Sequence, residues 1–141
     1  MSTYNSANVA NKTGVAAGGS AGTTLAAYAE VAVTAALTTA DTLNFFDLPA
    51  NARVLSMTLE ATDLDTNGSP TLAINVGDAG SANRYFAAST VGQAGTAAVA
   101  SAVAGIGFKT TAKTRIVGVP STNAATGVAG TVSLSCLYVV E

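Results

Sequence analysis

One stretch of this chain alternates between apolar and polar side chains, and this pattern constrains the fold more than any other feature. Within residues 53–62 the apolar members share one face and the polar members share the other: Leu55, Met57 and Leu59 against Ser56, Thr58 and Glu60. A period of two residues is that of a β-strand with one side buried and one side in solvent. We therefore expect a half-buried antiparallel sheet.

Segments of similar character recur along the chain and are separated by Gly, Pro, Asn and Asp. They predict about eight strands, at residues 29–37, 42–48, 53–62, 71–76, 84–88, 105–109, 114–119 and 131–140. Residues 96–104 fit either a strand or a short helix. Residues 63–70 are expected to form a loop, in which Asn67-Gly68 supplies the positive φ that a hairpin needs.

Short strands without a convincing amphipathic helix are typical of an all-β sandwich or barrel. The architecture we expect is an antiparallel β-sandwich of jelly-roll type with an extended N-terminal arm. An immunoglobulin-like sandwich stays open as the alternative, although the chain has no Trp and only one Cys to support it.

Residues 1–24 consist mainly of Ala, Gly, Ser, Thr and Asn, with little apolar bulk beyond Tyr4, Val9 and Val15. Such a segment buries too little surface to offset an ordering entropy of roughly 1–2 kcal/mol per residue. We expect an extended arm that is ordered by contact with a neighbouring subunit or larger partner, with these three side chains as its partner-binding residues. Residues 25–141 then form the β-sandwich domain.

Composition excludes several partners. Charged residues make up 10% of the chain against about a quarter in a typical domain, and the net charge is −2. The six basic residues are scattered, which argues against nucleic-acid binding. The most apolar run, residues 97–108, is too short to span a bilayer, and no secretory signal precedes the body, so we expect no membrane partner and synthesis in a cytoplasm.

The chain contains no His, which excludes the catalytic triads and dyads that depend on imidazole. Cys136 alternates with Val132, Leu134 and Tyr138 and is therefore expected to be a buried small hydrophobe. No catalytic residue, cofactor-binding residue or cofactor is predicted, and the protein is not expected to be an enzyme.

One loop has a metal-like pattern. Asp63, Asp65 and Asn67 place oxygens at alternate positions before Gly68, as in a calcium loop. The twelfth position is Ile74 instead of a bidentate Glu, so an ordinary Asx-rich hairpin turn is the favoured interpretation and a weak cation site the alternative.

Several predicted strands, such as residues 31–37 and 132–140, lack the Lys, Pro or inward charge that guards an exposed edge. Their edges should be paired or covered. Their outward positions carry Thr, Ser and Ala, which allow another protein surface to approach closely. Both features favour a homo-oligomer or a protein partner.

Parts of the chain resemble small virion proteins of tailed bacteriophages that decorate or cement the outside of the capsid. The resemblance rests on the run from Phe45 to Leu55, the strand end from Leu72 to Ala79 and the closing strand from Ala129 to Leu134. It implies a β-rich homo-oligomer, often a trimer, that sits on the capsid surface and binds the major capsid protein. No catalytic residue carries over.

The function we expect is therefore a structural virion protein, made in the host cytoplasm, that stabilises a capsid. Another phage structural role, as a head fibre base, neck or tail protein, is the first alternative. A small-ligand or enzyme domain is the second, and it would need a pair of carboxylates in a pocket that the sequence does not reveal.

Overall fold

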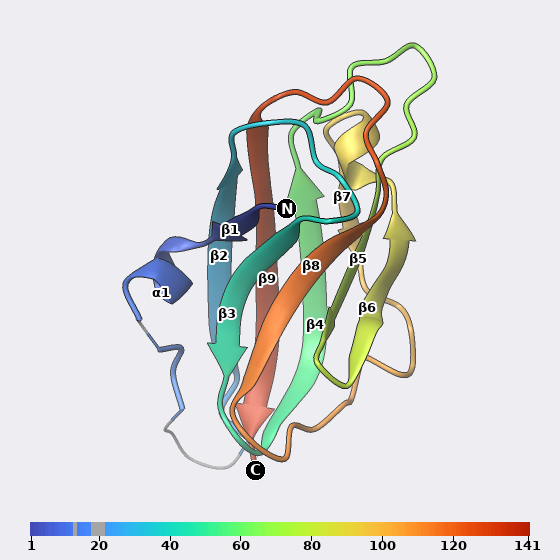
Figure 1. Cartoon of the computed structure of the whole chain (residues 1–141). Coiled ribbons are helices and arrows are strands. Elements are labelled where there is room, and N and C mark those ends of the chain that lie inside the picture. Colours follow the sequence, from blue (N-terminus) through green and yellow to red (C-terminus); the bar gives the residue numbers. More distant parts are fainter. Residues whose placement is uncertain (13, 18–21) are drawn as a thin grey trace.

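The computed structural model describes residues 1–12, 14–17 and 22–141 and shows two β-sheets stacked face to face (Figure 1). Sheet I has the strand order β1-β3-β8-β5-β6, and sheet II has the order β2-β9-β4-β7. The strands are β1 (Thr3–Asn5), β2 (Leu25–Val33), β3 (Thr42–Leu48), β4 (Ala52–Ala61), β5 (Ala73–Asp78), β6 (Ser81–Ser89), β7 (Ala97–Val99), β8 (Thr114–Thr122) and β9 (Gly130–Val140).

The prediction of an all-β chain is confirmed. Helical structure in the described residues is limited to α1 (Ala7–Ala10) and the 3₁₀ turn η1 (Val91–Gln93). No helix among these residues is long and apolar enough to cross a membrane.

Alternation of side chains builds the core between the sheets. In β2 the residues Ala27, Ala29, Val31 and Val33 are buried, and the residues between them are exposed. The long strand β9 pairs with β2 on one side and β4 on the other, so it lies inside sheet II. This pairing within the chain accounts for the absence of edge-guarding residues in the last strand.

A β-bulge in β4 changes the face on which Leu55 lies. The register with β9 shifts between Val54 and Ser56, so that Val54 and Met57 are both buried and Leu55 is 43% exposed. The prediction that Leu55 faces the core with Met57 and Leu59 is therefore wrong. A bulge inserts one residue into the strand and reverses the alternation on one side of it.

The expected hairpin around Asn67-Gly68 is also corrected. The strands on either side of it, β4 and β5, belong to different sheets, so residues 62–72 cross from sheet II to sheet I. Gly68 does not have a positive φ.

The prediction of a strand at residues 105–109 is wrong, and the segment left open between strand and helix, residues 96–104, contains a strand. Residues 105–109 contain turns and one isolated bridge, between Lys109 and Arg53, instead of a strand. The undecided segment 96–104 contains the short strand β7, followed by turns.

Candidate functional site

The N-terminal residues lie against the side of the sandwich where β3 and β2 are the neighbouring strands of the two sheets (Figure 1). β1 pairs in parallel with β3, with Tyr4 opposite Leu43. The backbone N–H of Ser2 donates to Asp41 at 2.7 Å, and the N–H of Thr42 donates to the Ser2 carbonyl at 2.9 Å. β1 thereby covers the edge of sheet I that β3 would otherwise expose.

Ser6 is the most buried polar residue of this region, with 1% of its surface exposed. Its N–H donates to the Asn44 carbonyl at 3.0 Å, and its hydroxyl donates to the Phe45 carbonyl. The same hydroxyl accepts from the N–H of Val9 at 3.4 Å, as the N-cap of α1. Phe45 sits at an irregularity in the pairing of β3 with β8, where its carbonyl is free to turn toward Ser6.

The three predicted partner-binding residues all lie along this path. Tyr4 and Val15 are partly buried and pack against the core of their own chain, and Val9 lies within α1. Beside Val9, the Asn8 side chain donates to the Tyr28 carbonyl of β2 at 3.0 Å. Contact of these residues with a partner stays a prediction.

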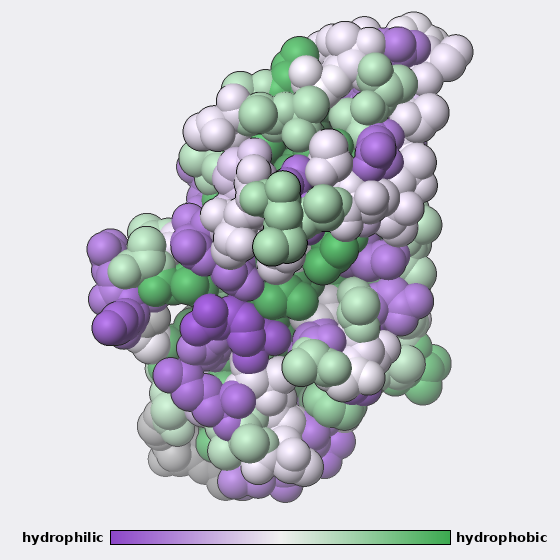
Figure 2. Space-filling model, viewed as in Figure 1, coloured by the Kyte–Doolittle hydropathy of each residue, from purple (hydrophilic) through white to green (hydrophobic). Residues whose placement is uncertain are grey.

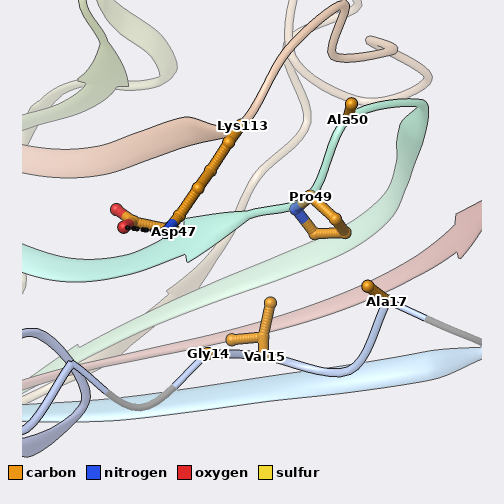
Figure 3. Close-up of a pocket in the computed structure, with 7 residues that line it drawn as sticks. All are labelled: Gly14, Val15, Ala17, Asp47, Pro49, Ala50 and Lys113. Atoms are coloured by element: carbon orange, nitrogen blue, oxygen red, sulfur yellow. Dashed lines mark ion pairs between the residues drawn. The ribbon is translucent and has the colours of Figure 1, made fainter.

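Val15 lines a hollow of about 310 Å³ (Figure 3). Val15, with Gly14 and Ala17, forms one side, and Pro49 forms the other, together with the ion pair in which Lys113 contacts Asp47 at 3.4 Å. Next to Val15 in the chain, the Ala16 carbonyl accepts a hydrogen bond from the hydroxyl of buried Tyr138. The N-terminal residues are therefore held to both sheets, through β3 and through Tyr138 of β9.

Burial opposes ionisation of Asp41, but hydrogen bonds from the Thr38 N–H and the Ser2 N–H hold the pKa of this carboxyl below its usual value. The charged carboxylate is thus an anchor for the first residues of the chain. In the sequence, Asp41 stands between two predicted strands and has no feature that distinguishes it from an ordinary turn residue.

The candidate metal loop has a different geometry from a cation site. Asp65 is buried, and its carboxylate accepts four backbone N–H groups, from Thr71 and Leu72 of its own loop and from Ala125 and Thr126 of the loop before β9. Burial disfavours the charged form, yet these hydrogen bonds lower the pKa of Asp65. Its oxygens connect two loops, which the sequence pattern did not reveal.

The other two residues of that pattern make local turns. Asp63 accepts from the N–H of Asp65 at 3.1 Å, and Asn67 accepts from the N–H of Ser69 at 2.9 Å. Among the described residues there is no group of three or more acidic, Cys or His side chains that could hold a metal ion.

A second charged cluster joins the β5–β6 turn to the segment before β8. The guanidinium of Arg84 contacts Asp78 at 2.7 Å and stacks on the ring of Phe108, 3.7 Å from its centroid. Burial opposes the charge on Asp78, but the hydrogen bond from Arg84 and those from backbone N–H groups keep the pKa of this carboxyl low. The arrangement is that of a structural clamp.

The thiol of Cys136, the one cysteine of the chain, is buried and unreactive. Cys136 is 1% exposed, as expected from its alternation with apolar residues, and burial raises the pKa of its thiol to about 12. A thiol that stays protonated is a poor nucleophile.

Comparison with solved structures finds similar chains in bacteriophage capsids. The chain aligns with a chain of the cyanophage Pam1 capsid asymmetric unit at 41% identity, over 93% of this chain and 96% of that one, with a TM-score of 0.80. It aligns with a chain of the capsid of Ralstonia phage GP4 at 30% identity, over 90% of each chain, with a TM-score of 0.72.

The chain belongs to a family of bacteriophage capsid proteins. This membership gives it a structural role as a virion component. A chain of the acidic stable capsid of Helicobacter pylori bacteriophage KHP30 shares the fold at 17% identity, over 86% of this chain and 90% of that one, with a TM-score of 0.62. Neither the sequence patterns of known protein families nor curated proteins match this phage capsid protein.

Proposed function

We propose that this chain decorates the outer surface of a bacteriophage capsid and stabilises it by binding the major capsid protein. The observation that carries the proposal is its likeness, over nearly its whole length, to chains of two solved phage capsids at 41% and 30% identity.

The strand order supports a jelly-roll assignment within this proposal. From β2 to β5 the chain alternates between sheet II and sheet I, and only β5 and β6 form a hairpin within one sheet. Two four-stranded sheets that exchange strands in this way are the arrangement of a jelly roll, to which β1 adds an extra edge strand.

Residues 1–24 are proposed as an arm that reaches neighbouring capsid subunits through Tyr4, Val9 and Val15. In the isolated chain the described part of this arm lies on its own domain, and most of its direct hydrogen bonds are with β3 and the turn before it. A homo-oligomer, proposed as a trimer, would multiply weak contacts of this kind, because each contact after the first is intramolecular.

The test is binding to capsids of the source phage that were assembled without this chain. The purified protein is mixed with these capsids, sedimented and quantified in the pellet, and the temperature of capsid disruption is measured with and without it. We expect saturable binding and a higher disruption temperature, because a ligand of the assembled state stabilises that state. Absence of binding would refute the decorating role and leave a neck or tail location.

The arm is tested with the variant that lacks residues 1–24. We expect this variant to keep its β-sheet circular dichroism and to lose most of its binding to the same capsids. If the truncated protein binds as well as the full chain, the arm has no part in capsid binding.

A further inference from the structure

Large apolar side chains that reach solvent gather on one face of the sandwich. Tyr28, Leu55, Val99 and Leu137 are between 43% and 66% exposed, and all four project from the outer face of sheet II. The other exposed large apolar residues among those described are Val103, in the loop after β7, and Met1. Scattered exposed apolar residues are normal, but their concentration on one face marks an interaction surface.

The strand register brings these residues into neighbouring rows. Tyr28, Ser135, Thr58 and Val99 follow one another across β2, β9, β4 and β7. The next row contains Leu137, which is opposite Ser56 and therefore beside Leu55. Small hydroxyl side chains separate the apolar ones, so a partner surface can approach the sheet closely.

The outer face of sheet I has a different character. Figure 2, viewed from the side of sheet I, shows mostly polar and weakly coloured residues with small patches of strongly hydrophobic ones. Its charges are also neutralised locally, because Asp47 pairs with both Arg115 and Lys113. Sheet I thus offers a partner fewer unmet interactions than sheet II.

Two acidic side chains border the apolar rows of sheet II. Glu30 in β2 and Glu60 in β4 are both opposite Ser133 of the strand between them. Adjacent strands lie about 4.8 Å apart, which places the two backbones roughly 10 Å from each other. A hollow of about 230 Å³ opens here, lined by both Glu side chains, Ser133, Thr131, Thr62 and Tyr28, whose hydroxyl donates to Ser133 at 3.2 Å.

Within the described residues, Glu30 and Glu60 make neither an ion pair nor a hydrogen bond through their carboxylates. The carboxylates of Asp47, Asp78 and Glu141 pair with Arg or Lys, and those of Asp41 and Asp65 accept backbone N–H groups. Every described Arg or Lys except Lys12 is already in an ion pair. The chain therefore supplies almost no cation of its own for this hollow.

We propose that the outer face of sheet II is the surface that seats on the capsid shell, and that it takes a Lys or Arg of the shell protein between Glu30 and Glu60. Apolar shell side chains then cover Tyr28, Val99 and Leu137. This inference rests on the proposed function and assigns the surface that performs it. A second copy of this chain is the poorer occupant, because two such faces stacked together would join four carboxylates, while every described Arg or Lys except Lys12 is already in an ion pair.

The test compares two double variants in the capsid-binding experiment. Glu30→Gln with Glu60→Gln raises the net charge from −2 to zero at sheet II, and Asn83→Lys with Ala87→Lys raises it equally at the exposed positions of β6. Circular dichroism and the melting temperature establish that both are folded. We expect the Gln pair to weaken binding at least tenfold and to flatten its salt dependence, and the β6 pair to change binding less than twofold.

Leu137→Ser provides an apolar readout at an exposed position and should weaken binding with little change in salt dependence. If the wild-type protein binds capsids and both sheet II variants bind as well as wild type, the assignment of sheet II as the capsid-binding face is wrong, while the decorating function stands. If wild type itself does not bind, the function fails first. A change in the oligomeric state of the free protein, by analytical ultracentrifugation, with unchanged capsid binding would make sheet II a self-association surface and overturn the proposal.

Discussion

Replacing Ser6 by Ala should loosen the N-terminal residues without unfolding the sandwich. The substitution removes the hydroxyl that donates to the Phe45 carbonyl and accepts from the Val9 N–H. Loss of an N-cap costs about 0.5–2 kcal/mol, and the 3.4 Å distance to Val9 places this one at the lower end. A buried carbonyl left without a partner costs about 1–3 kcal/mol more.

Together these effects give a loss of about 2 kcal/mol in the free energy that holds residues 2–10 to the body. Since about 1.4 kcal/mol corresponds to a factor of ten, the open form should become about thirtyfold more populated. The readout is native-state hydrogen exchange of two amides, the Ser6 N–H bonded to Asn44 and the Thr42 N–H bonded to Ser2. Amides in the centre of β9 serve as the internal reference.

Ser2→Ala is the matched control, because Ser2 is exposed and contributes only its backbone groups to this contact. It should leave exchange at both amides within a factor of two of wild type. If Ser6→Ala accelerates exchange equally in β9 and at Ser6, the N-terminal residues unfold only with the whole domain. If exchange at Ser6 does not change, the hydroxyl contributes nothing, and the reasoning from its burial is refuted.

Three further predictions concern the body. Arg84→Ala should lower the free energy of unfolding by about 2–3 kcal/mol in urea titrations, because it leaves Asp78 buried without its counterion. The control Arg115→Ala removes a more exposed ion pair and should lower the free energy of unfolding by less than about 1 kcal/mol. Tyr85→Phe should raise stability by about 1 kcal/mol, since the Tyr85 hydroxyl is buried without a hydrogen-bond partner among the described residues; a loss would reveal a partner for that hydroxyl. Folding lowers the pKa of Asp65, so the contribution of this carboxylate to the free energy of unfolding should be constant above about pH 5 and decline as the pH falls below about 4. Asp65→Asn should be less stable at pH 7, and its free energy of unfolding should decline less steeply with falling pH. An unchanged slope of stability against pH would contradict the role of this carboxylate.

Period-two alternation predicted the all-β class because it depends only on which residues the sheets bury. β3 occupies residues 42–48, as predicted, since a turn containing Asp41 and a break at Pro49 delimit it. The first strand of sheet II begins at Leu25, earlier than predicted, because its small residues, such as Ala27, are buried as effectively as Val. Small side chains give a weak hydropathy signal even where the core includes them.

Long-range pairing was beyond the reach of local patterns. Asn67-Gly68 looks like a hairpin turn, but the Asp65 carboxylate binds backbone groups of a loop some sixty residues away and directs the chain into the other sheet. Glu30 and Glu60 lie thirty positions apart in the sequence, and they become neighbours of one hollow only because β9 inserts between their strands. The spacing of these residues in the sequence predicts neither arrangement.

The absence of edge-guarding residues also takes on a different meaning. In β9 it reflects pairing on both sides within the chain. The other predicted strand, residues 31–37, belongs in part to β2, which is the edge strand of sheet II and pairs with β9 on one side. β9 therefore gives no reason for an external partner at a sheet edge. Unmet interactions remain on the outer face of sheet II, where apolar side chains reach solvent and where Glu30 and Glu60 have no ion-pair partner among the described residues.

The bulge in β4 links the fold to that surface. Val54 and Met57 are both buried, so the two residues between them must fit outside the regular alternation, and Leu55 is placed in solvent by the backbone and not by a choice of rotamer. A strand without the bulge would turn Leu55 into the core and leave the row beside Leu137 polar. The register of the sheet therefore places Leu55 outside the core of the isolated chain. A partner that covers Leu55 would gain about 25 cal/mol for each Å² of apolar surface removed from water.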